Sequence, residues 1–167
     1  MIKVDAVDRM NEEERLKYML ILTKGQIGSE KDVLANISNV TAIIKACVDD
    51  LNWAGFYLMK NGQLVLGPFQ GLPACNRIGI GKGVCGTAVE KRETQLVPDV
   101  HLFPGHIACD SASNSELVVP IIKDGKAYGV LDMDSPSKNR FKELHRVYFE
   151  KLVHLLNQHT DWNKVTE

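Results

Sequence analysis

Two dipeptides, Asn61-Gly62 and Asp124-Gly125, restrict the fold of this 167-residue chain more than any other feature. Each is flanked by strand-like residues: the first lies within Trp53–Phe69, and the second lies between Leu117–Ile122 and Ala127–Asp132. Such pairs favour tight hairpin turns because they tolerate positive φ angles. We therefore expect antiparallel strands, paired as two hairpins, in the middle of the chain.

Apolar side chains recur at helical spacing near both ends of the chain. A first helix is predicted from the N-cap Asn11 to about Gly25, a second over residues 32–48, and a third over residues 141–159. Helices at the ends and strands between them indicate an α+β fold with a largely antiparallel sheet. The length suits one domain spanning residues 1–167.

Charge and hydropathy exclude several classes of function. The net charge of -1 and the pI of about 6.5 do not favour electrostatic binding to nucleic acid. No apolar run approaches the roughly 18–20 residues of a membrane span, and the charged N-terminus lacks a signal-peptide core. We expect a cytoplasmic protein with neither nucleic-acid nor membrane partners, whose four cysteines serve chemistry, metal binding or packing.

The cysteines fall into two groups. Cys47 lies on the apolar stripe of a predicted helix, where a buried thiol is inert. Cys75, Cys85 and Cys109 lie in glycine- or proline-rich segments that we expect to be loops, although Val84–Glu90 could form a short helix. A substrate can reach a loop thiol, so these three cysteines are the candidates for chemistry.

Two kinds of chemistry suit these residues. The possible zinc ligands in this region are Cys75, Cys85, His101, His106 and Cys109. Their spacing disfavours zinc, since structural sites usually draw ligands in close pairs, and we expect no metal. In the redox alternative a thiolate attacks an oxidised sulfur, a sulfenic acid forms, and a second cysteine closes a disulfide. Cys109 is the preferred nucleophile because His106 lies three residues away and the polar run 110–115 offers hydrogen-bond donors.

Three acidic residues could converge on one pocket. Asp132 and Asp134 alternate along a strand and should share a face, with Met133 opposite. Glu116 opens the preceding strand and could lie beside them. Together they would suit a cation such as an ammonium group, or could raise one another's pKa so that one donates a proton to a sulfoxide oxygen. Solvated charges at strand ends are an equally compatible interpretation.

Trp53 and Tyr57 share one face of a predicted strand, with Gly55 between them, while the intervening residues face the core. This arrangement predicts a slot for a small apolar group such as an S-methyl. For either aromatic residue alone, a buried position in the core is the default interpretation.

Six segments within about residues 10–160 closely resemble the free methionine-(R)-sulfoxide reductases, which are single-domain enzymes of the GAF fold. These segments are Asn52-Trp-Ala-Gly-Phe-Tyr-Leu, Leu66-Gly-Pro-Phe-Gln-Gly, Gly81-Lys-Gly-Val-Cys-Gly-Thr-Ala, Val97-Pro-Asp-Val-His, Phe103-Pro-Gly-His-Ile-Ala-Cys-Asp-Ser-Ala-Ser-Asn-Ser-Glu and Gly129-Val-Leu-Asp-Met-Asp-Ser. The resemblance implies a GAF-like fold, with a central, mainly antiparallel sheet of about six strands and the N- and C-terminal helices packed on one face.

The resemblance also implies residue roles. Cys109 corresponds to the catalytic cysteine, Cys75 to the main resolving cysteine, and Cys85 to a further cysteine that can enter the disulfide relay. The substrate-binding residues that it implies are the pocket carboxylates Glu116, Asp132 and Asp134 and the aromatic wall of Trp53 and Tyr57.

The expected reaction is the reduction of free L-methionine-(R)-sulfoxide to L-methionine through a sulfenic acid and an intramolecular disulfide. Thioredoxin would reduce that disulfide, no cofactor would be bound, and NADPH would enter only through thioredoxin reductase. Three other functions fit parts of the pattern: a ligand-binding GAF sensor, a zinc-binding structural module, and a general peroxidase that uses Cys109. GAF domains often dimerise, so a homodimer is compatible with the sequence.

Overall fold

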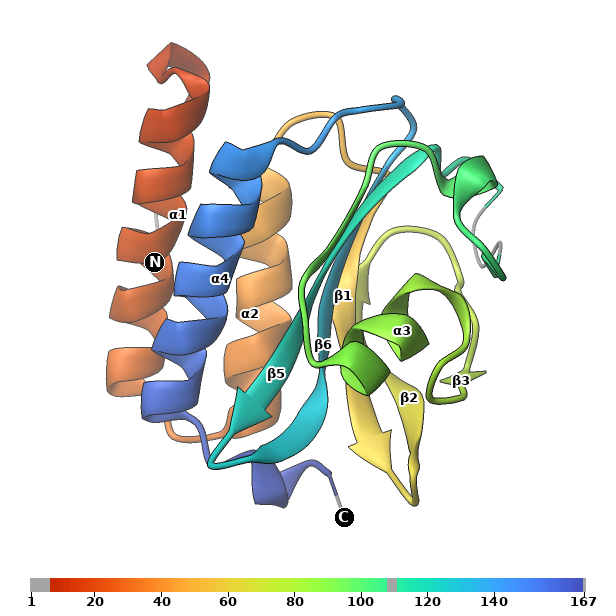
Figure 1. Ribbon diagram of the computed structural model, residues 1–167. Coiled ribbons are helices and arrows are strands. Elements are labelled where there is room, and N and C mark those ends of the chain that lie inside the picture. The colour runs from red at the N-terminus through yellow and green to blue at the C-terminus, as the bar shows by residue number, and fades with distance from the viewer. Residues whose placement is uncertain (1–6, 108–110, 167) are drawn as a thin grey trace.

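The chain forms a sheet with helices on both faces. The computed structural model describes residues 7–107 and 111–166, with α1, α2 and α4 on one face of the sheet and α3 on the other (Figure 1). In chain order the elements are η1 (Val7–Arg9), α1 (Glu12–Ser29), α2 (Val33–Cys47), β1 (Trp53–Lys60), β2 (Gln63–Gln70), β3 (Arg77–Ile78), α3 (Gly83–Lys91), β4 (Gln95–Val97), η2 (Val100–Leu102), β5 (Ser115–Lys123), β6 (Lys126–Ser135), α4 (Glu143–His159) and η3 (Trp162–Lys164).

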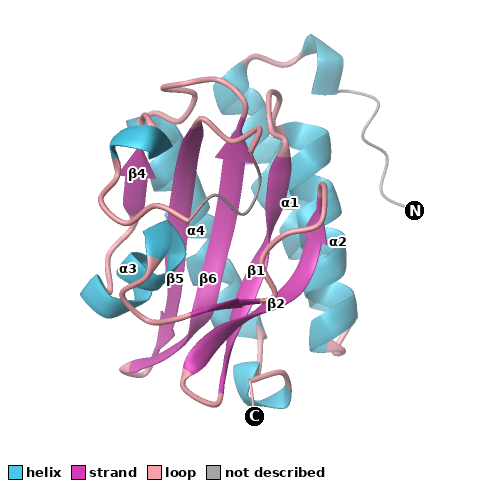
Figure 2. Ribbon diagram, turned by 90° about the vertical axis from the view of Figure 1, so that its right-hand side faces the viewer, coloured by secondary structure: helices cyan, strands magenta, loops and turns pink. Residues whose placement is uncertain are grey.

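The sheet has six strands in the order β3-β2-β1-β6-β5-β4, and every neighbouring pair is antiparallel (Figure 2). Both predicted hairpins are present, because β1 pairs with β2 and β5 pairs with β6. At both turns the two central residues have positive φ, 50° and 77° in the first hairpin and 50° and 78° in the second. Pairing of β1 with β6 joins the hairpins. The predicted α+β class and antiparallel sheet are confirmed.

Helix α1 begins where its capping residue predicts, whereas α4, predicted from residue 141, begins at Glu143. The side chain of Asn11 accepts a hydrogen bond from the backbone N–H of Glu14, and the Glu14 carboxylate accepts one from the N–H of Asn11. The end predicted for α1 at Gly25 is wrong, since the helix continues to Ser29. A helical glycine costs only about 1 kcal/mol, and burial of Ile27 in the next turn outweighs that cost.

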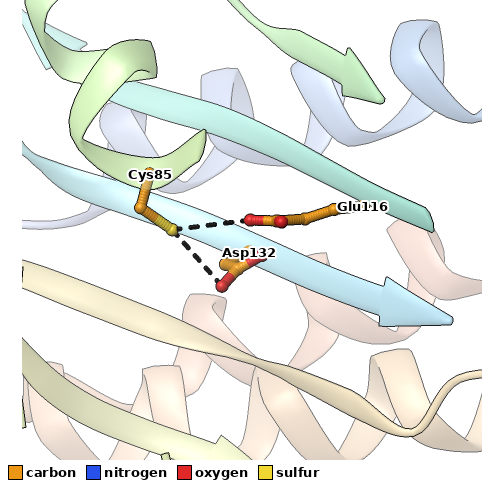
Figure 3. A group of neighbouring side chains, drawn as sticks. All are labelled: Cys85, Glu116 and Asp132. Carbon is orange, nitrogen blue, oxygen red and sulfur yellow. Dashed lines mark hydrogen bonds between the residues drawn. The ribbon is translucent and has the colours of Figure 1, made fainter. Parts of the chain in front are cut away.

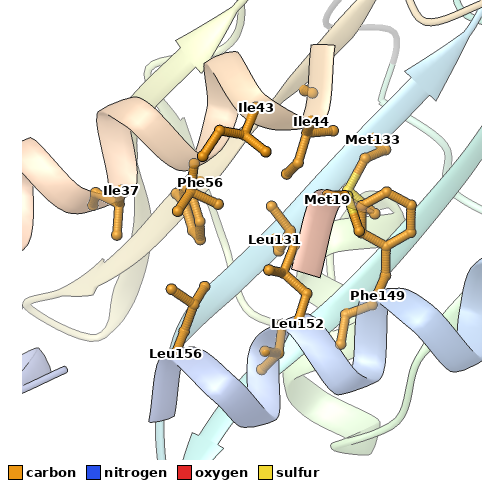
Figure 4. Close-up of a cluster of buried hydrophobic side chains, with 14 of the residues drawn as sticks. Met19, Ile37, Ile43, Ile44, Phe56, Leu131, Met133, Phe149, Leu152 and Leu156 are labelled. Carbon is orange, nitrogen blue, oxygen red and sulfur yellow. The ribbon is translucent and has the colours of Figure 1, made fainter. Parts of the chain in front are cut away.

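The larger core lies between the sheet and the terminal helices (Figure 4). As the alternation in β1 predicts, Phe56 points into this core, to which Ile37 of α2 and Leu156 of α4 also belong. The predicted packing of the N- and C-terminal helices on one face is therefore confirmed. No helix in residues 7–107 and 111–166 combines the length and apolar character that a membrane span requires.

A smaller apolar cluster lies between α3 and the opposite face of the sheet, and it includes Trp53 and Tyr57. Gly86 allows α3 to approach its preceding loop, because a Cβ there would lie 2.3 Å from the carbonyl oxygen of Gly79. The expectation that Cys85 lies in a loop is wrong: it is in the first turn of α3 and is buried. The short helix considered over Val84–Glu90 is present as Gly83–Lys91.

Candidate active site

A pocket with about 470 Å³ of space free of atoms, including its open mouth, lies between the first turn of α3 and the sheet. Six of the side chains predicted to have a function line this pocket: Trp53, Tyr57, Cys85, Glu116, Asp132 and Asp134. The structure therefore brings together residues that are widely separated along the chain.

The carboxylates meet because their strands are neighbours. Glu116 of β5 lies opposite Asp134 of β6 in the ladder, and Asp132 lies two positions along β6 on the same face. Met133 points to the other face, into the larger core, as predicted. Glu116 and Asp132 are buried and Asp134 is half-buried. The interpretation of these three residues as solvated strand-end charges is thus wrong for Glu116 and Asp132.

The thiol of Cys85 contacts both buried carboxylates (Figure 3). Its Sγ lies 3.3 Å from Oδ2 of Asp132 and 4.0 Å from Oε1 of Glu116, within the range of weak thiol hydrogen bonds. The other carboxylate oxygen of Asp132, Oδ1, is buried without a hydrogen-bond partner among the described residues. This oxygen is an acceptor available to a ligand.

Burial without an ion-pair partner raises the pKa values of Asp132, Glu116 and Cys85. Burial raises the pKa of Asp132 to about 7. Burial, and then the Asp132 carboxylate, raise the pKa of Glu116 well above its ordinary value. The same causes raise the pKa of the Cys85 thiol. Near neutral pH the pocket therefore holds protons that a bound cation could replace.

The aromatic residues form a wall of the pocket, but not the slot that the sequence predicts. The rings of Trp53 and Tyr57 stack with centroids 5.8 Å apart. A Cβ on Gly55 would lie 2.7 Å from a ring carbon of Trp53, so the indole covers the glycine and closes the expected gap. The Trp53 indole N–H is buried without an acceptor in the described chain, which makes it a donor available to a ligand.

Cys75 is disulfide-bonded, whereas Cys47 and Cys85 are free thiols. Cys75 is half-buried, and its carbonyl oxygen accepts a hydrogen bond of 2.9 Å from the hydroxyl of Tyr57. Cys47 is buried on α2 as predicted, and burial raises the pKa of its thiol to about 11. Cys109, the predicted nucleophile, lies outside the described residues.

Sequence reasoning overlooked Lys82, which precedes α3 at the pocket, and Ile107, which packs against Gly83. No motif in the sequence singled out this lysine. Ser113, from the polar run singled out for its donors, also lines the pocket. Among the five residues considered as zinc ligands, His106 and Cys85 both line this pocket. The His101 ring instead forms a hydrogen bond with the side chain of Asn114.

Comparisons with known proteins agree with this architecture. The family model described as GAF domain matches residues 40–159. The free methionine-R-sulfoxide reductase of Saccharomyces cerevisiae is 44% identical over 163 residues, covering 93% of this chain and 91% of that protein. The enzyme of the same name from Escherichia coli is 46% identical over 141 residues, covering 83% of this chain and 86% of its own.

A solved structure leads to the same family. The X-ray structure of free methionine-R-sulfoxide reductase from Neisseria meningitidis, in complex with its substrate, has a TM-score of 0.88 and 38% identity, and covers 93% of each chain. The fold, the matched segments and these relatives together identify the chain as a member of the GAF-domain family of free methionine-R-sulfoxide reductases, a group of oxidoreductases.

Proposed function

We propose that this protein reduces free L-methionine-(R)-sulfoxide to L-methionine. The observation that carries the proposal is the pocket itself, in which an unsatisfied Asp132 oxygen and an unsatisfied Trp53 N–H lie beside buried acids and an aromatic wall. The names of the yeast and Escherichia coli relatives support the choice of substrate.

In our proposal the substrate ammonium group binds among Glu116, Asp132 and Asp134. A cation there would relieve the repulsion between buried carboxylates and satisfy Asp132. A methionine sulfoxide inside a polypeptide has an uncharged amide at that nitrogen and would leave the acids without a cation. The preference for the free amino acid follows from this difference. The apolar S-methyl end would contact the aromatic wall of Trp53 and Tyr57.

The chemical step uses Cys109. Its thiolate attacks the sulfoxide sulfur while a protonated pocket acid donates to the oxygen. A bond forms between the Cys109 sulfur and the substrate sulfur, the substrate S–O bond breaks, and the protonated oxygen leaves as water. A water molecule then attacks the Cys109 sulfur, the sulfur–sulfur bond breaks, methionine leaves, and Cys109 becomes a sulfenic acid as one proton returns to solvent. The substrate sulfur is thereby reduced by two electrons and Cys109 is oxidised by two.

Cys75 then resolves the sulfenic acid. Its sulfur attacks that of Cys109, water leaves, and a Cys75–Cys109 disulfide forms. The disulfide bond at Cys75 supports this choice, as does its half-buried position. Cys85 could enter the relay as a further cysteine by exchange with this disulfide, but its buried, protonated thiol makes Cys75 the first resolving residue.

Thioredoxin would reduce the disulfide by thiol exchange, with NADPH consumed by thioredoxin reductase and no cofactor bound to this chain. We place the reaction in the cytoplasm, where free thiols are maintained.

The test couples the protein to thioredoxin, thioredoxin reductase and NADPH, and compares free L-methionine-(R)-sulfoxide, its S epimer and a peptide-bound sulfoxide. Turnover of the free R form alone, abolished in Cys109→Ser, is the expected result. In Cys75→Ser, pre-reduced enzyme should form about one methionine per chain and then stop, because the first half-reaction needs only Cys109. Absence of turnover with every sulfoxide would contradict the proposal and favour a ligand-binding GAF domain.

A further inference from the structure

We propose that Cys85, Glu116 and Asp132 form a binding site for one divalent cation of the zinc class, and that the bound cation inhibits the enzyme by blocking the substrate pocket. The binding site stands independently of the proposed function, whereas the inhibition rests on it.

The donor atoms have the spacing that a tetrahedral zinc ion needs. Metal–sulfur and metal–oxygen bonds of about 2.3 and about 2.0 Å at a tetrahedral angle separate sulfur from oxygen by about 3.5 Å. The distances from Cys85 Sγ to the carboxylate oxygens are 3.3 Å to Asp132 and 4.0 Å to Glu116. All three donor atoms lie within 4.8 Å of one another. The two sulfur–oxygen distances are therefore each within about 0.5 Å of the tetrahedral value.

Regular secondary structure positions each donor. Cys85 belongs to the first turn of α3, Glu116 to β5 and Asp132 to β6, and their side chains converge between the helix and the sheet (Figure 3). The three residues are only 3%, 6% and 5% exposed, respectively. A site built on such elements is already organised before the cation arrives, so little conformational entropy is lost on binding.

A second observation points to a missing ligand. Oδ1 of Asp132 is buried and has no hydrogen-bond partner among the described residues. Within residues 7–107 and 111–166, no lysine, arginine or histidine forms an ion pair with Asp132 or Glu116. A buried carboxylate oxygen without a hydrogen-bond partner is a rare arrangement in proteins, and a cation would satisfy it.

The donor set selects the class of metal. One thiolate and two carboxylates suit a borderline-soft ion such as Zn²⁺, whereas Ca²⁺ and Mg²⁺ take oxygen ligands at higher coordination number. On binding, the Cys85 S–H bond breaks, a sulfur–metal bond forms, and the proton leaves to solvent, so no redox partner is needed. The fourth position would face the pocket and be open to water.

Such a cation would compete with the substrate. It would occupy the place that we assign to the ammonium group, since both require Asp132 and Glu116. The expected kinetic effect is a raised KM for the free sulfoxide with kcat unchanged.

Co²⁺ is the probe for binding, because thiolate coordination produces a charge-transfer band in the near ultraviolet. The titration uses the reduced full chain carrying Cys75→Ser and Cys109→Ser, which leaves Cys47 and Cys85 as the thiols. One Co²⁺ per chain with this band is expected, and Zn²⁺ should displace it. Adding Cys85→Ser should abolish the band, adding Asp132→Asn should weaken binding at least tenfold, and adding Cys47→Ser should change nothing.

Circular dichroism and thermal melting would confirm that each variant folds. The proposal is overturned if no charge-transfer band forms in the folded protein, or if the band survives Cys85→Ser.

Inhibition is measured separately, as methionine formed in a single turnover by pre-reduced wild-type enzyme without thioredoxin. Added Zn²⁺ should raise the sulfoxide concentration needed for half-maximal rate, and a chelator should reverse the effect. Zn²⁺ that binds without changing this concentration would overturn the inhibitory role. A protein that binds Co²⁺ as expected but reduces no sulfoxide would refute the proposed function and leave the metal site intact.

Discussion

The sulfur of Cys85 lies 3.3 Å from Oδ2 of Asp132, although 47 positions separate the two residues in the chain. This contact puts a protonated thiol and a buried carboxylate together in a pocket where no basic side chain of the described residues forms an ion pair with Asp132. Buried ionisable groups without partners lower the stability of a fold, so such an arrangement indicates a binding role.

Asp132→Asn should lower kcat/KM for free methionine-(R)-sulfoxide by about 10- to 100-fold, because an amide cannot compensate the ammonium charge. It should leave the free energy of unfolding unchanged or higher, since the substitution removes a buried charge. Steady-state kinetics and urea unfolding measure the two effects. The N-acetylated sulfoxide, which lacks the ammonium, is the control substrate. An equal loss with both substrates would contradict the assigned role of Asp132.

Trp53→Phe should raise the KM for the free sulfoxide by about 3- to 10-fold, equivalent to one hydrogen bond of about 1 kcal/mol. The phenyl ring keeps much of the stacking on Phe69, whose centroid is 5.3 Å from that of Trp53, but lacks the unsatisfied N–H. Trp162→Phe is the matched control, because the Trp162 N–H donates to Asn157 far from the pocket. That control should lower stability and leave KM unchanged. An unaltered KM in Trp53→Phe would show that the indole N–H does not contact substrate.

Gly86→Ala should destabilise the protein by about 1–3 kcal/mol, because the new methyl group would overlap the carbonyl oxygen of Gly79. Gly25→Ala is the matched control in α1, where a Cβ would have no neighbour within 4 Å. That substitution should stabilise the helix by about 1 kcal/mol. Urea unfolding of both variants gives the comparison. Equal effects would mean that α3 does not pack as closely on its loop as described.

His145 predicts a loss of stability in mild acid. It is fully buried, its Nδ1 accepts a hydrogen bond of 3.1 Å from the Lys142 N–H, and its Nε2 lies 3.0 Å from a Glu12 oxygen. Burial lowers its pKa, and the Arg140 guanidinium adds to this effect, while the Glu12 carboxylate offsets part of it. The folded protein therefore resists protonation that the unfolded chain accepts below a pH of about 6.5. Stability is fully present above that pH and falls as pH decreases towards the lower folded pKa.

Urea unfolding at pH 7.5 and 5.5 should show this loss, with a slope of at most about 1.4 kcal/mol per pH unit for one proton. His145→Gln should reduce the difference between the two pH values. His154→Gln, at an exposed position of the same helix, should leave it unchanged. A His145 variant with the wild-type difference would assign the acid sensitivity to other groups.

Much of the architecture follows from local rules. Asn61-Gly62 and Asp124-Gly125 adopt the positive φ angles expected of them. Side-chain alternation in β1 correctly places Phe56 and Trp53 on opposite faces of the sheet. These predictions succeed because turn sterics and strand periodicity act between residues close in sequence. The one clear failure among the helices, the end of α1, occurs where tertiary burial of Ile27 outweighs the low helix propensity of Gly25.

What the sequence by itself determined was the class of fold, the positions of the two hairpin turns and the set of residues capable of chemistry. Only the tertiary structure decided that Cys85 belongs to a helix and contacts Asp132, and that the Trp53 indole covers Gly55. Only the tertiary structure distinguished buried Glu116 from a solvated strand-end acid. The physical reason is that desolvation and close packing depend on which distant elements meet, here α3 over β5 and β6, and no local pattern encodes that meeting.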